Sequence, residues 1–236
     1  MPDIGFSTGA LFKGDLVAGV NAATTLGLPV IELSALRLSE LTPLVEFVGS
    51  RKLSQFRYVS VHSPTNFAEE QEETVSQALL KIAHDRGWPI VVHPDNIRDL
   101  DAWAPFGDHL CVENMDKRKP AGRTVGELRE VFERLPMARL CFDMAHAYQV
   151  DTSMTEAYQI LREFGSRICQ VHLSQLATNS RHERLSDTTV GAFREIARFI
   201  PANIPVILET PVALADAPRE IRQATKIFEV VPIPAH

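Results

Sequence analysis

Six consecutive apolar segments of this chain end on a histidine or on an acidic residue. These last positions hold His62, His93, Glu113, Asp143, His172 and Glu209, in the contexts VSVH, VVH, CVE, CFD, QVH and ILE. Imidazole and carboxylate groups together form the ligand sets of Zn, Mn, Fe and Co sites. Carboxylates gathered without a cation would repel one another, and their charge would be costly to bury. The pattern therefore predicts a divalent metal site, if the fold brings the six segment ends together.

The chain alternates short apolar runs, which predict strands, with longer amphipathic stretches, which predict helices. The expected strands cover residues 4–10, 29–34, 57–62, 89–93, 109–114, 139–143, 167–172 and 205–210, and the clearest helices cover 16–26, 69–86, 125–135, 154–164, 188–199 and 218–228. Eight nearly continuous apolar strands suit a closed parallel barrel. We therefore expect an α/β fold, a (β/α)8 TIM barrel that forms a single domain over residues 1–236. In this fold the carboxyl ends of the strands meet on one rim, where active sites lie.

Helix start signals support several of these elements. Thr124 with Glu127 and Ser153 with Glu156 have the spacing of a capping box, and Asp216 is placed to cap the last helix. The segments after the second and fourth strands are short and carry weaker helix signals.

Two cysteines share strand faces with predicted ligands. Cys111 lies two residues before Glu113, and Cys141 lies two residues before Asp143. Because side chains alternate along a strand, both cysteines should point into the barrel one layer beneath the metal site. We expect them to act as small buried hydrophobic residues, with metal ligation or redox chemistry as the lesser alternative. An odd number of scattered cysteines does not predict a disulfide framework.

Composition narrows the function classes. The chain has 236 residues, of which 45% are hydrophobic and 23% charged, and this suits one barrel of about 250 residues. The net charge of −6 argues against nucleic acid as a partner, because proteins that bind the phosphate backbone usually carry a positively charged surface. Without a signal-like segment or an apolar run of roughly 18 residues, we expect a cytoplasmic protein that is not inserted in a membrane.

The residue order resembles the xylose isomerase-like TIM barrel superfamily, also called AP endonuclease family 2. Within it, HP at the fourth strand, EN at the fifth, D-x-x-HA at the sixth and ILETP at the eighth are most similar to endonuclease IV. The likeness runs from the first strand to the last. It implies a divalent-metal enzyme with Zn, Mn or Fe, at one to three ions per chain.

The resemblance also implies how the ligands divide among the ions. Glu113 would bridge two ions, with His62 and His93 completing the first site, and Asp143, His172 and Glu209 the second. His146 and His182 would hold a third ion. Ser180 stands where endonuclease IV has an aspartate, two residues before His182.

Three function classes stay open, and hydrolysis of a small phosphoester ranks slightly ahead. In such a hydrolase, metal ions activate water and stabilise the departing oxygen. His62 and His93 favour this class, because a single-metal enzyme has no need of them. The basic loop 117–123 (KRKPAGR) could attract an anionic substrate through Lys117 and Arg123, as could Arg181 further on.

The second class is sugar or sugar-phosphate isomerisation or epimerisation with a single metal. Glu113 and Glu209 would then form an acid–base pair that passes a proton between carbons. By resemblance to hydroxypyruvate isomerases, His146, Arg181 and His182 would bind the substrate.

The third class is a multinuclear iron oxygenase. Such an enzyme often acts on a peptide partner, and because we see no peptide-binding extension in this sequence, this class ranks third. We expect a small-molecule substrate as the partner, as the first two classes require, and by analogy with related barrels a homodimer.

Overall fold

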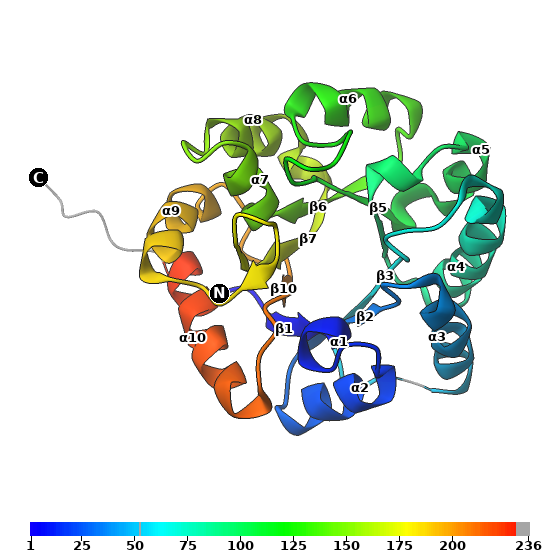
Figure 1. Ribbon diagram of the computed structural model, residues 1–236, viewed down its shortest axis with the longest axis horizontal. Helices are drawn as coiled ribbons and strands as arrows, with labels where there is room; N and C mark the ends of the chain where they lie inside the picture. The colour runs from blue at the N-terminus through cyan, green and yellow to red at the C-terminus, as the bar shows by residue number, and fades with distance from the viewer. Residues whose placement is uncertain (52, 230–236) are drawn as a thin grey trace, which may run out of the picture.

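The computed structural model describes residues 1–51 and 53–229, and eight of its strands close into a parallel barrel. Figure 1 shows these strands as a central ring with helices around it. The strands are β1 (Ile4–Ser7), β2 (Val30–Ser34), β3 (Tyr58–His62), β4 (Ile90–Val92), β5 (Leu110–Glu113), β6 (Arg139–Asp143), β7 (Ile168–Leu173) and β10 (Val206–Leu208). Around the ring they run β1-β10-β7-β6-β5-β4-β3-β2. The predicted single-domain (β/α)8 barrel is confirmed.

Helices cover the outside of the ring and connect the strands. The α-helices are α1 (Thr8–Leu11), α2 (Leu16–Thr25), α3 (Leu38–Ser50), α4 (Glu72–Arg86), α5 (Leu100–Trp103), α6 (Val125–Arg134), α7 (Met144–Val150), α8 (Thr155–Phe164), α9 (Asp187–Ala197) and α10 (Ala217–Phe228). Short 3-10 helices are η1 (Glu69–Gln71), η2 (Pro94–Asn96), η3 (Ala104–His109), η4 (Gly165–Arg167) and η5 (Leu214–Asp216). Within the described ranges, no helix is long and apolar enough to cross a membrane.

Several expected boundaries needed correction. The first strand stops at Ser7, although the sequence predicts a strand up to residue 10. The Ser7 hydroxyl accepts a hydrogen bond from the Ala10 backbone and so caps α1, which replaces the end of the predicted strand. After β2 the connection forms α3, a full helix of 13 residues. The connection after β4 forms only the four-residue α5 between 3-10 turns. The weak helix signal was therefore a correct guide after β4 but not after β2.

The capping predictions had mixed outcomes. The Thr124 hydroxyl accepts from the Glu127 backbone at 3.2 Å, as the motif predicts, but the Glu127 carboxylate accepts from the Arg123 backbone instead of the Thr124 backbone, so only half of the capping box forms. The second capping box is wrong, because α8 is capped by Met154 in a left-handed conformation, and the Glu156 carboxylate accepts from another helix instead. Asp216 occupies the cap position of α10, but its side chain pairs with an arginine rather than with the helix backbone.

A small apolar layer fills the barrel beneath the rim. It consists of Val91, Cys111, Cys141 and Cys169, all buried. Cys111 and Cys141 thus lie in the interior, as their strand positions predict. The sulfur atoms of Cys111 and Cys169 are in contact, which the spacing did not predict, and Cys141 is a buried thiol.

Candidate metal centre

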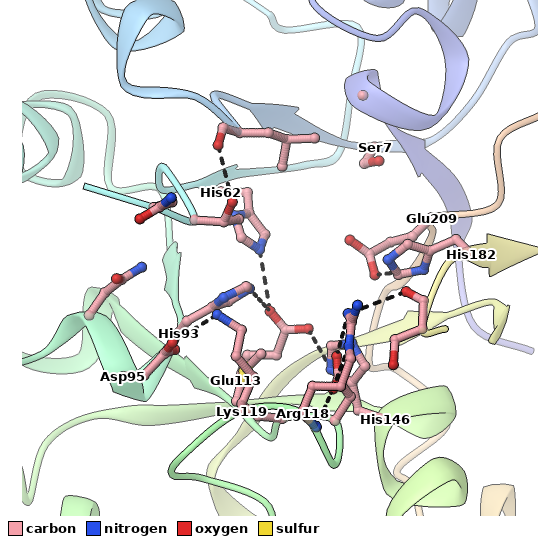
Figure 2. Close-up of a pocket in the computed structure, with 18 of the residues that line it drawn as sticks. Ser7, His62, His93, Asp95, Glu113, Arg118, Lys119, His146, His182 and Glu209 are labelled. Atoms are coloured by element: carbon pink, nitrogen blue, oxygen red, sulfur yellow. Dashed lines mark hydrogen bonds and ion pairs between the residues drawn. The ribbon is translucent and has the colours of Figure 1, made fainter. Parts of the chain in front are cut away.

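Glu113 occupies the centre of a ring of histidines at the carboxyl ends of the strands (Figure 2). Its Oε2 atom lies 3.3 Å from Nε2 of His62 and 3.3 Å from Nε2 of His93. Its Oε1 atom lies 3.3 Å from Nδ1 of His172 and 3.3 Å from Nδ1 of His146. The carboxylate is 1% exposed, so these imidazoles take the place of water around it. Glu113 thus lies between the histidines that the resemblance assigns to different ions; its role as a bridging ligand stays a prediction.

Four side chains converge on one buried spot next to Glu113. Donor atoms of Glu113, Asp143, His172 and Glu209 all lie within 4.8 Å of one another. They come from β5, β6, β7 and the residue after β10, four strands that are consecutive in the ring. Oδ2 of Asp143 is buried and has no hydrogen-bond partner among the described residues. Three carboxylates and one imidazole with an unpartnered oxygen fit a divalent cation.

The charges at this spot oppose one another. Burial alone would raise the pKa of Glu113, but the neighbouring imidazoles, His172 and His146 foremost, lower it well below its usual value. Burial raises the pKa of Asp143 to about 6, with Glu113 and Glu209 adding to the effect and His146 opposing it. Burial likewise raises the pKa of Glu209. A bound cation would relieve this competition among carboxylates.

A second group of donor atoms overlaps the first. His62, Glu113 and His172 also lie within 4.8 Å of one another, and the His62 and His93 rings are 5.2 Å apart. Burial alone would lower the pKa of His62, but Glu113 and Glu32 raise it to about 9. The structure thus brings both extra histidines to Glu113.

The residues expected to hold a third ion have other partners. Nδ1 of His146 is 2.9 Å from the Asn114 carbonyl, and Nδ1 of His182 is 2.8 Å from the Ser174 hydroxyl. The two rings are 6.3 Å apart, and neither joins a candidate metal cluster in residues 1–51 and 53–229. His182 is held by a hairpin of β8 (Gln175–Leu176) and β9 (His182–Glu183), drawn in yellow in Figure 1. The Ser180 hydroxyl donates to Gln149 at 2.7 Å.

The basic loop after β5 lines the cavity through other residues than expected. The cavity above the centre has a volume of about 650 Å³, and Arg118 and Lys119 line it. The described residues that line the cavity do not include the predicted Lys117, Arg123 and Arg181. Lys117 and Arg181 are exposed, and Arg123 forms an ion pair with Glu127 in the first turn of α6. The backbone N–H of Lys119 donates to the Asp116 carbonyl at 3.1 Å, and this tight turn leaves Lys117 outside the cavity that Arg118 and Lys119 line.

Sequence reasoning missed one buried acidic residue of the interior. Glu32, in β2, is 0% exposed and lies 3.0 Å from Nε2 of His172. A signal was present, since Glu32 is the single charged residue in the apolar run VIELS. Glu32 stands in the middle of its strand, whereas the pattern that predicts the metal site consists of the last residues of strands.

The family is decided by the second half of the chain. A model described as xylose isomerase-like TIM barrel matches residues 94–229, which include four of the six strand-end residues, from Glu113 onward, and their connecting helices. The chain belongs to this family. No curated protein matches it in sequence.

Solved structures share the fold over nearly the whole chain. A D-tagatose 3-epimerase-like protein is 15% identical with a TM-score of 0.69, covering 95% of this chain and 96% of that one. The 3-keto-D-glucoside 4-epimerase from E. coli is 14% identical with a TM-score of 0.61, covering 96% and 99%. An AP endonuclease, family 2, from Brucella melitensis is 11% identical with a TM-score of 0.57, covering 92% and 99%.

Proposed function

We propose that this chain is a divalent-metal-dependent isomerase or epimerase of sugars or sugar phosphates. The observation that carries the proposal is the convergence of Glu113 and Glu209 with Asp143 and His172 on one buried spot. Glu113 and Glu209 also line the cavity above it, where a small molecule would lie. The names of two proteins with the same fold, a D-tagatose 3-epimerase-like protein and a 3-keto-D-glucoside 4-epimerase, support the sugar class.

A divalent ion held at this spot would polarise a substrate carbonyl and acidify the adjacent C–H bond. Glu113 and Glu209 then move the proton. They approach from β5 and from the end of β10, which are separated in the ring by β6 and β7. The imidazoles of His172 and His146 around Glu113 hold its carboxylate anionic, so it accepts the proton, and Glu209 supplies one from the end of β10. The reverse reaction exchanges these roles.

His146 is the residue best placed to orient the substrate. It lines the cavity, and its Nδ1 is engaged 2.9 Å from the Asn114 carbonyl. Its Nε2 is therefore the ring atom left for a substrate hydroxyl.

Two of the cations that line the cavity wall are tightly paired. Arg118 contacts Asp116 at 3.0 Å, and Lys119 contacts Asp95 at 2.8 Å. Because each charge has a partner, these two residues add little net positive charge for a phosphate. Lys13 also lines the cavity and has no ion-pair partner among the described residues, so sugars and sugar phosphates are tested side by side.

The test is proton exchange at carbon in D2O. The protein is incubated with Mn²⁺ or Zn²⁺ and a panel of ketoses, aldoses and their phosphates, and NMR follows deuterium at the carbon next to the carbonyl. We expect an epimer or isomer that carries deuterium. Glu209→Gln should lower the rate by about 10²–10⁴-fold, the usual contribution of a general acid–base group.

Glu183→Gln serves as the matched control. Glu183 is an exposed residue of β9 away from the cavity lining, so the same chemical change there should leave the rate unchanged. Full exchange activity in the Glu209→Gln variant would contradict the acid–base assignment.

Hydrolysis of a phosphoester is the second candidate, favoured by His62 and His93. Both rings lie 3.3 Å from Oε2 of Glu113, whereas His172 contacts the other oxygen, Oε1, and so they offer ligands for a second ion. A hydrolase would cleave a generic phosphodiester and lose that activity in the His62→Ala and His93→Ala variants. Phosphodiester cleavage without sugar exchange would favour this candidate over the isomerase.

A further inference from the structure

Glu32 gathers hydrogen bonds on only one of its two oxygens. Its Oε2 atom accepts from Nε2 of Gln170 at 2.6 Å and from the hydroxyl of Ser60 at 3.2 Å, and it lies 3.0 Å from Nε2 of His172. Its Oε1 atom is buried and has no partner among the described residues. Taking a carboxylate out of water is costly unless its partners compensate. Packing alone does not offset the cost of burying the Glu32 carboxylate with one oxygen unpartnered, which points to a role for this residue in the barrel interior.

The orientation of Gln170 is set from its other end. The hydroxyl of Tyr58 donates to Oε1 of Gln170 at 2.7 Å, so the amide nitrogen must face Glu32. The amide nitrogen also lies 2.8 Å from Nε2 of His172. With the His172 proton on Nε2, both nitrogens donate to Oε2 of Glu32; with it on Nδ1, Gln170 would donate to Nε2 of His172.

The His172 ring spans the space between Glu32 and the proposed metal centre. Its Nε2 faces Glu32, whereas its Nδ1 lies 3.3 Å from Oε1 of Glu113 and 3.6 Å from Oε2 of Glu209. A neutral imidazole carries its proton on one nitrogen and a lone pair on the other, and only the lone pair can bind a metal. The ring position of that proton therefore decides whether His172 can act as a ligand.

We propose that Glu32 is a positioning residue that holds the His172 proton on Nε2 and so presents Nδ1 to the metal. The proposal rests on the metal centre of the proposed function and adds a residue outside the ligand set. Metal-bound histidines commonly donate their second ring N–H to a carboxylate, which fixes the ring and strengthens the ligand. Here that carboxylate comes from β2, on the far side of the barrel from β7.

The test compares Zn²⁺ affinity in two variants that lose the same kind of group. Glu32→Gln keeps the shape of the side chain and removes its charge, and we expect zinc affinity to fall roughly 10- to 100-fold, as for other supports of metal-bound histidines. Glu72→Gln is the control. Glu72 is also buried and accepts three hydrogen bonds on one oxygen, from Arg98, Asp99 and Trp103, but it lies in α4. We expect zinc affinity to be unchanged in that variant.

A second measurement locates the proton directly. Protein labelled with ¹⁵N-histidine is loaded with Zn²⁺, and long-range ¹H–¹⁵N spectra assign His172 by its absence in a His172→Asn variant. We expect a proton on Nε2 and a metal-shifted Nδ1. A proton on Nδ1, with Gln170 donating to Nε2, would overturn the proposal even if Glu32→Gln folds poorly.

The remaining outcomes separate this inference from the proposed function. If the wild-type protein binds no zinc, both the metal centre and the role of Glu32 are wrong. If wild type binds zinc and Glu32→Gln binds it equally well, only the role of Glu32 is wrong. If Glu72→Gln loses affinity to the same degree, the effect is general destabilisation and the proposal is overturned.

Discussion

The side chain of Asn114 holds both backbone groups of Asp143. Its amide nitrogen donates to the Asp143 carbonyl at 2.8 Å, and its amide oxygen accepts from the Asp143 N–H at 2.8 Å. Asn114 follows β5 directly and Asp143 ends β6, so the clamp continues the pairing of the two strands beyond their last backbone contact. It thereby sets where the Asp143 carboxylate enters the proposed metal centre.

Replacing Asn114 with Ala should destabilise the protein and weaken metal binding together. Both Asp143 groups are buried, and each loses its partner, so we expect a loss of about 2–4 kcal/mol in the free energy of unfolding. Urea unfolding measures the loss, and Zn²⁺ titration measures the affinity. Asn203→Ala, at an exposed position before β10, is the control and should change neither quantity. Equal stability of the two variants would contradict the clamp.

Gly122 should be intolerant of a side chain, because the rim loop packs closely there. Its φ is +80°, and an added Cβ would lie 2.3 Å from Cγ of Pro94, next to His93. We expect Gly122→Ala to cost about 1–2 kcal/mol from the backbone conformation alone, and more from the clash. Gly191→Ala, in α9 with open space around it, should instead be neutral or stabilise by about 0.5–1 kcal/mol. Thermal unfolding of both variants checks the difference in sign.

Asp116 should titrate below the ordinary range of an aspartate. Burial alone would raise its pKa, but hydrogen bonds from Arg118 lower it. A lowered folded-state pKa means that the pair stabilises the fold above the unfolded pKa of about 3.9, and that this stabilisation is lost as pH falls through the folded value. NMR titration of the Asp116 carboxyl carbon in the wild type and in Arg118→Ala tests this. A midpoint that does not rise in the variant would contradict the role of Arg118.

Much of the site could be predicted because strand ends are local features. A histidine or acidic residue that closes an apolar run can be found without knowing the fold, and in a parallel barrel all such ends meet on one rim. Glu113, Asp143, His172 and Glu209 are brought together for this reason.

Contacts across the barrel could not be predicted in the same way. Glu32 and His172 are 140 residues apart and lie on strands that are not neighbours in the ring. Their meeting depends on which residues of each strand point inward at the same height. The direction of the loop cations depended in turn on one buried residue, Asp116, which holds the backbone of residue 118 and sends Arg118 along the cavity wall.

Metal content per chain, measured by elemental analysis of protein purified without chelator and then supplied with Zn²⁺, tests the central claim most directly. We predict at least one bound ion per chain in the wild type, lost in Glu113→Gln and Asp143→Asn variants whose circular dichroism stays native. A second ion that disappears with His62→Ala and His93→Ala would extend the centre to two metals. A wild-type protein that stays free of metal, or a Glu113→Gln variant that keeps all of it, would contradict the metal centre.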